Sequence, residues 1–347
     1  LSDVKNLGDQ VVTTLDVGLQ QAASDALGDR RGAVVVMEPD TGKILAMVSK
    51  PGFDPNQLSS QWESLISGDN TEAQLLNRAA QGVYPPGSTF KIVTLLEYIR
   101  EHPDTWEGFT FDCDGSYEYG DYKISCYHGT AHGHQSLLQA FANSCNGAFA
   151  EIGRNLDICA FESLADQLLF NKELPLDFPY SKSSFSLEES DPDVLKMMTA
   201  IGQGNTLVTP VHMAMLMSAI ANDGVLMKPR FLERTESYTG TLVERYPKET
   251  YGSIMTQEEA ELLQLFLRTV VEDGTASALK SSIYEASGKT GTAEYSSDKK
   301  KSHAWFTGYA TDGERELAVA VIVEGAGSGS EYAVPIAGKI FDAYFGK

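Results

Sequence analysis

Three short stretches of this chain carry the side chains that an acyl-transfer reaction needs. Residues 88–91 read Ser-Thr-Phe-Lys, residues 144–146 read Ser-Cys-Asn, and residues 289–291 read Lys-Thr-Gly. Together they supply hydroxyls, amines and an amide, which can act as nucleophile, base, proton relay and substrate anchor. Each stretch alone recurs by chance, so their surroundings decide whether they form one site.

Ser88 is the candidate nucleophile because of what surrounds it. Residues 85–87 are Pro-Pro-Gly, which stiffens the approach and allows a tight turn, and residues 90–99 are apolar nearly all round. This pattern predicts a buried helix with Ser88 at its N-terminus, where free N–H groups favour a developing anion.

Lys91 lies three residues after Ser88 and is the candidate base. It projects from the same helix face, into an apolar region near another cation, and both effects lower a lysine pKa. A neutral Lys91 could take the Ser88 proton. The alternative is a serine cap beside a lysine that reaches solvent, but the two further motifs favour catalysis.

Ser144 and Asn146 follow an amphipathic helical run at residues 137–141. From a turn, residues two apart can aim polar groups at one pocket. Ser144 could relay a proton to a leaving amine, and Asn146 could hold a substrate amide. Cys145 between them is expected to be buried and inert.

Lys289 opens the third motif, where a strand edge would offer backbone groups to an extended peptide. Its cation suits a carboxylate, Thr290 and Thr292 add hydroxyls, and Gly291 lets a ligand approach the backbone closely. The three lysines at residues 299–301 are expected to lie in a solvated turn rather than in a binding patch.

The composition excludes several classes of protein. The chain has 347 residues, 42% of them hydrophobic, and a net charge of −21. Such acidity argues against nucleic-acid binding and against a polybasic membrane patch, and indicates solubility. No stretch approaches the roughly 18 apolar residues of a membrane span. The chain starts with leucine and without a signal-peptide pattern, which we interpret as a piece of a longer protein.

Cysteine is sparse, with four residues in all. Cys113 and Cys126 flank a polar segment rich in glycine and tyrosine, and their spacing suits a disulfide in an oxidising compartment. Two free thiols are the alternative. Three histidines lie nearby, at positions 128, 132 and 134, but no Cys-x-x-Cys pair accompanies them, so a zinc site is not expected.

The pattern of the chain predicts strands at both ends and helices between them, and therefore one compact domain. Residues 33–37 and 44–48 read as a hairpin, and 304–310 and 317–323 as two further strands. Helices are expected after Asp16, after the pairs Asp191-Pro192 and Thr209-Pro210, after the capping box at Thr256, and after Pro335, with a long surface loop over residues 172–193.

In this order the three motifs resemble the Ser-x-x-Lys, Ser-Asp-Asn and Lys-Thr-Gly signature of class A β-lactamases and penicillin-binding proteins. The chain resembles the transpeptidase domain of class B penicillin-binding proteins from about Val11 to its end. Besides the motifs, the resemblance rests on residues 77–79, 84–91, 126–146, 201–204, 273–276 and 304–309.

The resemblance implies an α/β (α+β) fold, a five-stranded antiparallel sheet covered by helices with an all-helical part beside it. Residues 1–347 would form a single transpeptidase (penicillin-binding) domain, without the family's N-terminal membrane anchor and pedestal domain. The resemblance also implies a place on the extracytoplasmic face of the bacterial membrane, a membrane-embedded glycan polymerase as partner, and no metal or organic cofactor.

The resemblance implies that Ser88 attacks the D-Ala-D-Ala carbonyl of a peptidoglycan stem peptide, and that β-lactams acylate Ser88. Lys91 would be the base, Ser144 and Lys289 would transfer protons, and Asn146 would anchor the peptide amide. Thr290 and Thr292, which flank Gly291, would bind the terminal carboxylate. The backbone N–H groups of Ser88 and Thr292 would form the oxyanion hole.

Three rivals stay open at this point. A β-lactamase needs a deacylating base, yet neither Glu162 nor Glu173 lies in a Glu-x-x-Leu-Asn pattern, and Cys145 replaces the aspartate of class A enzymes. A D,D-carboxypeptidase would use water as the acceptor. A β-lactam sensor domain would be acylated and signal, but would usually be smaller.

Overall fold

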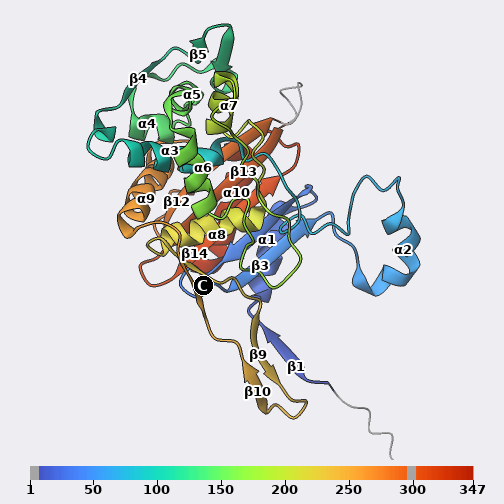
Figure 1. The fold of residues 1–347 in the computed structure, drawn as a ribbon. Helices are drawn as coiled ribbons and strands as arrows, with labels where there is room; N and C mark the ends of the chain where they lie inside the picture. The colour runs from blue at the N-terminus through green and yellow to red at the C-terminus, as the bar shows by residue number, and fades with distance from the viewer. Residues whose placement is uncertain (1–7, 295–301, 347) are drawn as a thin grey trace, which may run out of the picture.

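A five-stranded antiparallel sheet forms the centre of the computed structural model, which describes residues 8–294 and 302–346 (Figure 1). The strand order is β12-β13-β14-β2-β3, so β2 from the start of the chain lies beside β14 from its end. The predicted meeting of the two ends in one sheet is confirmed. The strands are β2 (Gly32–Met37), β3 (Ile44–Lys50), β12 (Glu285–Glu294), β13 (Ser302–Thr311) and β14 (Glu316–Val323).

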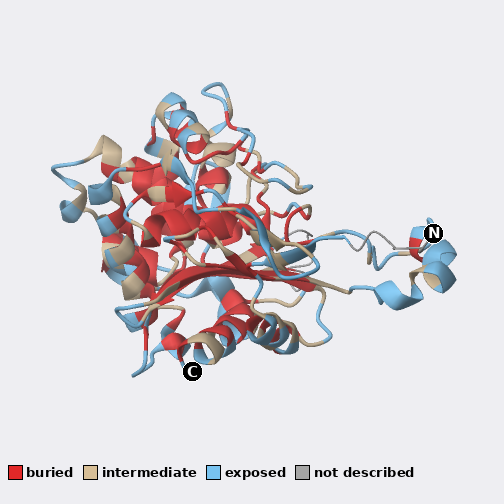
Figure 2. Ribbon diagram, turned by 90° about the horizontal axis from the view of Figure 1, so that it is seen from below, coloured by how far each residue is buried: buried red, intermediate tan, exposed pale blue. Residues whose placement is uncertain are grey.

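Helices cover both faces of this sheet (Figure 2). On one face lie α1 (Val17–Leu27) and α10 (Gly329–Phe345), which also contact each other. The carboxylate of Asp16 accepts a hydrogen bond from the Leu19 N–H and caps α1, as predicted. The opposite face is covered by α8 (Pro210–Ala221), whose residues are all buried.

The burial of α8 follows from its sequence, because it is apolar on every side. It lies between the sheet and the helical part of the molecule: the Thr307 hydroxyl on β13 donates to the Met213 carbonyl, and the His212 ring bonds the Leu168 carbonyl. Its methionines are core filler, as expected.

The helical part stands beside the sheet and carries two of the three motifs (Figure 1). Its first helix, α3, follows the Ser88 turn, and α4 and α5 flank the Ser-Cys-Asn turn. The predicted capping box between Thr256 and Glu259 opens α9, which packs on β12. The helices are α3 (Lys91–Glu101), α4 (Leu137–Ala142), α5 (Asn146–Asn155), α6 (Ile158–Gln167), α7 (Asp193–Ala200) and α9 (Gln257–Glu272).

Smaller sheets surround this body, and several of them pack on its helices (Figure 1). A three-stranded sheet and α2 (Leu58–Ile66) project away from it. The small sheets are β1 (Gln10–Thr13) with β9 (Leu232–Glu236) and β10 (Leu242–Arg245), β8 (Val225–Met227) with β11 (Thr250–Ser253), β4 (Thr110–Cys113) with β7 (Gly133–Ser136), and β5 (Ser116–Tyr119) with β6 (Tyr122–Ser125).

Three local predictions differ from the structure. Pro192 is itself the N-cap of α7 with extended backbone, so the helix begins one residue later. Helix α10 begins at Gly329 and contains Pro335, whose missing N–H removes one hydrogen bond from a helix that buries many side chains. The loop at 172–193 is anchored by buried apolar side chains, including Phe185, and is not wholly at the surface. The expected lysine turn at 299–301 lies outside the described residues.

Candidate active site

Ser88 lies in a single 3₁₀ turn (Gly87–Phe90) that runs directly into α3. The predicted buried helix is confirmed, with a tighter first turn at the serine. Two hydrogen bonds hold the approach: the Trp305 indole N–H donates to the Pro85 carbonyl at 3.1 Å, and the Gly87 N–H donates to the Gly202 carbonyl at 3.0 Å. Ser88 is half-buried and lines a cleft.

Glycines allow the backbones around Ser88 to approach one another closely. Gly87 has a φ of 53°, and a Cβ there would lie 2.7 Å from the Thr292 carbonyl oxygen. A Cβ on Gly202, which has a φ of 76°, would lie 1.9 Å from the Gly87 carbonyl oxygen. A side chain at Gly87 would push the Ser88 turn away from β12, and one at Gly202 would push the turn away from the segment around residue 202, so both glycines are needed to build the site.

Lys91 is fully buried and connects the first motif to the second. Its Nζ donates to the Ser144 carbonyl at 2.8 Å, to the Asn146 Oδ1 at 2.7 Å and to the Ser144 hydroxyl at 3.3 Å. Burial lowers the pKa of Lys91 to about 8. At neutral pH a useful fraction of the amine is therefore unprotonated and able to accept a proton.

The Ser-Cys-Asn turn joins α4 to α5 and presents its polar groups to Lys91. Ser144 has a φ of 56°, in the left-handed region, which reverses the chain between the two helices. The Asn146 amide nitrogen donates to the Ser125 carbonyl at 3.0 Å, so this side chain links Lys91 to the end of β6. The predicted convergence of Ser144 and Asn146 on one place is present in the structure.

Lys289, on β12, is the second fully buried amine of the site. Its Nζ donates to the Thr290 carbonyl at 3.2 Å and lies 5.5 Å from the centre of the Phe141 ring. Burial, and then the charge of Lys91, hold the pKa of Lys289 well below its usual range. A charged Lys91 therefore favours the neutral form of Lys289.

The third motif lies on a sheet edge, since β12 pairs only with β13 among the described strands. The Thr290 and Thr275 hydroxyls are 2.6 Å apart, and the Gln203 amide nitrogen donates to the Thr292 carbonyl at 3.1 Å. This edge borders a cleft of about 580 Å³. Among the residues that line it are Ser88, Ser144, Asn146, Thr290, Gly291 and Thr292.

All eight residues that the sequence singled out therefore meet at this cleft, six on its surface and the two lysines behind it. The arrangement offers a hydroxyl at a helix start, a buried amine with lowered pKa, and a strand edge for an extended peptide. These are the parts that serine acyl transfer requires. Gln203 and Thr275 were not predicted; each falls in a stretch that carries the family resemblance, but no motif gave it a role.

The predicted disulfide between Cys113 and Cys126 is not formed. Both thiols are free, and their Sγ atoms lie 3.7 Å apart. The two cysteines do approach, but Cys145 and His132 come to the same place. The Sγ atoms of the three cysteines and a His132 ring nitrogen lie within 4.8 Å of one another, in a set that could hold a metal ion. The spacing of these residues along the chain did not predict this cluster.

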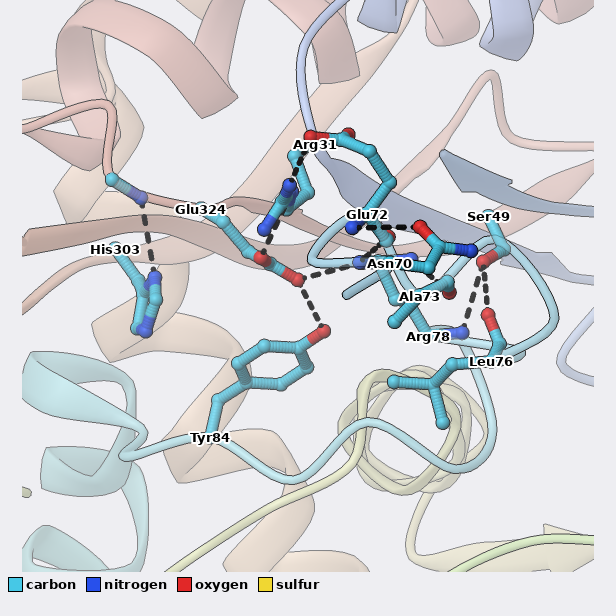
Figure 3. Close-up of polar contacts among 11 residues, drawn as sticks. Arg31, Ser49, Asn70, Glu72, Ala73, Leu76, Arg78, Tyr84, His303 and Glu324 are labelled. Carbon is cyan, nitrogen blue, oxygen red and sulfur yellow. Dashed lines mark hydrogen bonds and ion pairs between the residues drawn. The ribbon is translucent and has the colours of Figure 1, made fainter. Parts of the chain in front are cut away.

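A network of charged and polar side chains anchors the chain ahead of Ser88 (Figure 3). One Glu324 carboxylate oxygen, just beyond β14, accepts hydrogen bonds from the Tyr84 hydroxyl at 2.8 Å and from the Arg78 Nε at 2.9 Å. Arg78 also donates to the Ala73 and Glu72 carbonyls. Burial and the Glu324 charge raise the pKa of Tyr84, so its hydroxyl stays protonated and donates.

Replacing Tyr84 with phenylalanine tests this anchor. We expect Tyr84→Phe to lower the free energy of unfolding by about 1.5–3 kcal/mol, because a hydrogen bond to a charged, largely buried carboxylate is lost. Chemical denaturation measures the change, and Tyr238→Phe, at an exposed tyrosine, is the matched control. Equal stability of the two variants would contradict an anchoring role for the Tyr84 hydroxyl.

Within residues 8–294 and 302–346, no helix is both long and apolar enough to cross a membrane.

Comparison with known families and proteins identifies the family. The family model of the penicillin-binding protein transpeptidase domain matches residues 32–342 of this chain. The peptidoglycan D,D-transpeptidase PbpA of Mycolicibacterium smegmatis is 32% identical over 95% of this chain and 71% of its own length.

Solved structures give the same result. The D,D-transpeptidase domain of a peptidoglycan glycosyltransferase from Eggerthella lenta is similar with a TM-score of 0.89 and 29% identity, over 98% of this chain and 84% of that one. The penicillin G acyl-enzyme complex of penicillin-binding protein A from M. tuberculosis has a TM-score of 0.87 and 28% identity, over 97% and 81%. The chain therefore belongs to the penicillin-binding protein transpeptidase family.

Proposed function

We propose that this domain is a peptidoglycan D,D-transpeptidase that cross-links stem peptides through an acyl-enzyme on Ser88. The observation that carries the proposal is the buried Lys91 amine, which joins the Ser88 helix to Ser144 and Asn146 at the head of one cleft. Relatives named D,D-transpeptidase and an acyl-enzyme complex of a structural neighbour support it.

In the acylation step Lys91 removes the Ser88 proton as the hydroxyl oxygen attacks the carbonyl between the two terminal D-alanines. The N–H groups of Ser88 and Thr292 stabilise the negative oxygen of the tetrahedral intermediate. When the peptide bond breaks, the leaving amine takes a proton passed through Ser144 from the lysine pair. Free D-alanine departs and an ester remains on Ser88.

In the second step the amine of another stem peptide attacks this ester. The same groups work in reverse: a neutral lysine accepts the proton of the attacking amine, and the Ser88 oxygen regains a proton as it leaves. The product is a cross-link between two stems, and no water is consumed. Transfer to an amine rather than to water requires that the cleft hold the acceptor close to the ester.

The cleft also suggests how the donor peptide is held. The edge of β12 offers backbone hydrogen bonds to an extended peptide, and the Asn146 amide would bind a backbone amide of the stem. Thr290 and Thr292 would bind the terminal carboxylate, and Lys289 adds positive charge when it is protonated. A β-lactam would enter by the same contacts and acylate Ser88, but its amine stays tethered after ring opening and blocks the acceptor.

We also infer the setting from the family. The domain would work on the extracytoplasmic face of a bacterial membrane, on stem peptides of peptidoglycan that a membrane-embedded glycan polymerase delivers. The net charge of −21 and the absence of a basic footprint in the sequence support a substrate other than nucleic acid.

Two measurements on the same protein test the reaction class. Intact-mass spectrometry with benzylpenicillin should show one adduct per chain, on the Ser88 peptide and stable for hours; rapid loss of the adduct with accumulation of hydrolysed drug would indicate a β-lactamase. A D-Ala-D-Ala peptide incubated with an amine acceptor should then give mainly the amide product. Predominant hydrolysis would indicate a D,D-carboxypeptidase.

A further inference from the structure

Four sulfur and nitrogen donors from separate segments meet beside the catalytic turn. Cys113 ends β4, Cys126 follows β6, His132 precedes β7, and Cys145 is the N-cap of α5. The three cysteines are buried and His132 is half-buried, and their donor atoms all lie within 4.8 Å of one another. From their geometry we propose that they bind one zinc ion.

Three of the six distances between the donors match the edges of a zinc tetrahedron, and the other three are at most 4.8 Å. With Zn–S near 2.3 Å and Zn–N near 2.0–2.1 Å, tetrahedral angles place two sulfurs about 3.8 Å apart and a sulfur and a nitrogen about 3.6 Å apart. The Sγ of Cys126 lies 3.7 Å from that of Cys113 and 3.8 Å from that of Cys145, and Cys113 Sγ lies 3.4 Å from His132 Nδ1. A zinc ion at their centre would draw in those pairs that now lie beyond the tetrahedral distance, by at most about 1 Å.

The surroundings suit thiolate ligands. The backbone N–H groups of Asn146 and Gly147 point at the Cys126 sulfur, and such hydrogen bonds stabilise metal-bound thiolates. The buried Gln135 Nε2 lies near the Cys145 sulfur and lacks a hydrogen-bond partner among the described oxygen and nitrogen atoms. A thiolate at Cys145 gives it an acceptor. Three thiolates and one imidazole select zinc over the hard cations magnesium and calcium.

The binding step is balanced by proton release. Each cysteine that is a thiol in the free protein loses its proton to solvent as its sulfur bonds the ion, and the neutral His132 ring contributes a nitrogen lone pair. No redox change occurs. Because all four positions of the tetrahedron are filled by protein, the ion is structural. It ties the β4–β7 strand pair and the β5–β6 hairpin to Cys145, between Ser144 and Asn146, and so fixes the turn that holds Lys91.

Metal analysis of the whole chain tests the proposal without any activity measurement. Protein purified without a histidine tag, supplied with zinc and then desalted, should retain about one zinc per chain by mass spectrometry of the metal. Cobalt in place of zinc should give the near-ultraviolet thiolate charge-transfer band and the strong visible bands of a tetrahedral site. This second measurement needs no variant and does not depend on how a mutant folds.

Substitutions then assign the ligands. Cys113→Ser and His132→Ala should weaken zinc binding by 10-fold or more, whereas Cys159→Ser, at the exposed fourth cysteine, should bind zinc like the parent. A parent protein that retains no zinc and gives no cobalt bands would overturn the proposal. So would a stable Cys113–Cys126 disulfide, seen as a loss of two hydrogens in the intact mass. Neither result would bear on acylation of Ser88, which is measured separately.

Discussion

Ser88→Ala is expected to abolish covalent labelling by benzylpenicillin while leaving the fold intact. Ser88 lines the cleft from the turn that leads into α3, one helical turn before Lys91, so loss of this hydroxyl should lower the acylation rate by at least about 10³-fold. Ser88 is half-buried, and removal of its hydroxyl should change the free energy of unfolding by about 1 kcal/mol or less.

The measurement is intact-mass spectrometry after hours with excess drug, with a thermal melt on the same sample. Ser330→Ala provides the matched control, because Ser330 lines the same cleft but belongs to none of the three motifs. Labelling of Ser88→Ala at the rate of the parent would place the nucleophile elsewhere. If Ser88→Ala melts tens of degrees below the parent, its loss of labelling would reflect unfolding, and Ser88→Thr would be measured in its place.

Lys91→Ala is expected to slow acylation at neutral pH by about 10²–10⁴-fold, the usual contribution of a general base. The parent should show a matching pH dependence. Because burial sets the Lys91 pKa at about 8, the amine is mostly protonated at pH 6 and cannot accept the Ser88 proton. The acylation rate should therefore rise about 10-fold per pH unit below 8 and level off above it.

Stopped-flow measurement of acylation across this pH range tests the role of Lys91. Lys91→Met keeps most of the buried volume and should also lack the rise, which separates loss of the base from a packing defect. Lys123→Ala, at the exposed rim of the cleft, should keep the parent profile. A parent rate that is flat between pH 6 and 8 would contradict the role of Lys91 as the base. A Lys289 variant is measured alongside, because the pKa of Lys289 is also lowered in this site.

Much of this fold could be predicted because its elements carry local signals. Apolar runs predicted β2 and β14, and capping residues predicted α1, α8 and α9 to within a few residues. The start of α10 could not be predicted, since Pro335 reads as a helix start. Burial of the helix against α1 and the sheet offsets the hydrogen bond that Pro335 lacks.

In the candidate site, too, residues in contiguous motifs could be predicted and residues brought together by the fold could not. The three motifs were visible because each is contiguous, and the helix after Ser88 correctly predicted that Lys91 is buried. Gln203 and Thr275 join the site only through long-range packing. The cluster of Cys113, Cys126, His132 and Cys145 was missed for a related reason: its members lack the close spacing of familiar zinc motifs, and the fold brings them together.

The pairing of β2 with β14 has a consequence for how the domain acquires its structure. Almost the whole chain separates these neighbouring strands, so the sheet has no centre until residues near Val323 are available. Closing so long a loop is slow, and the valines of β2 stay exposed meanwhile. Because the strand bearing Lys289 joins the sheet through β13 and β14, we expect the cleft to be among the last parts to form, and an incomplete chain would present apolar strand edges to other molecules.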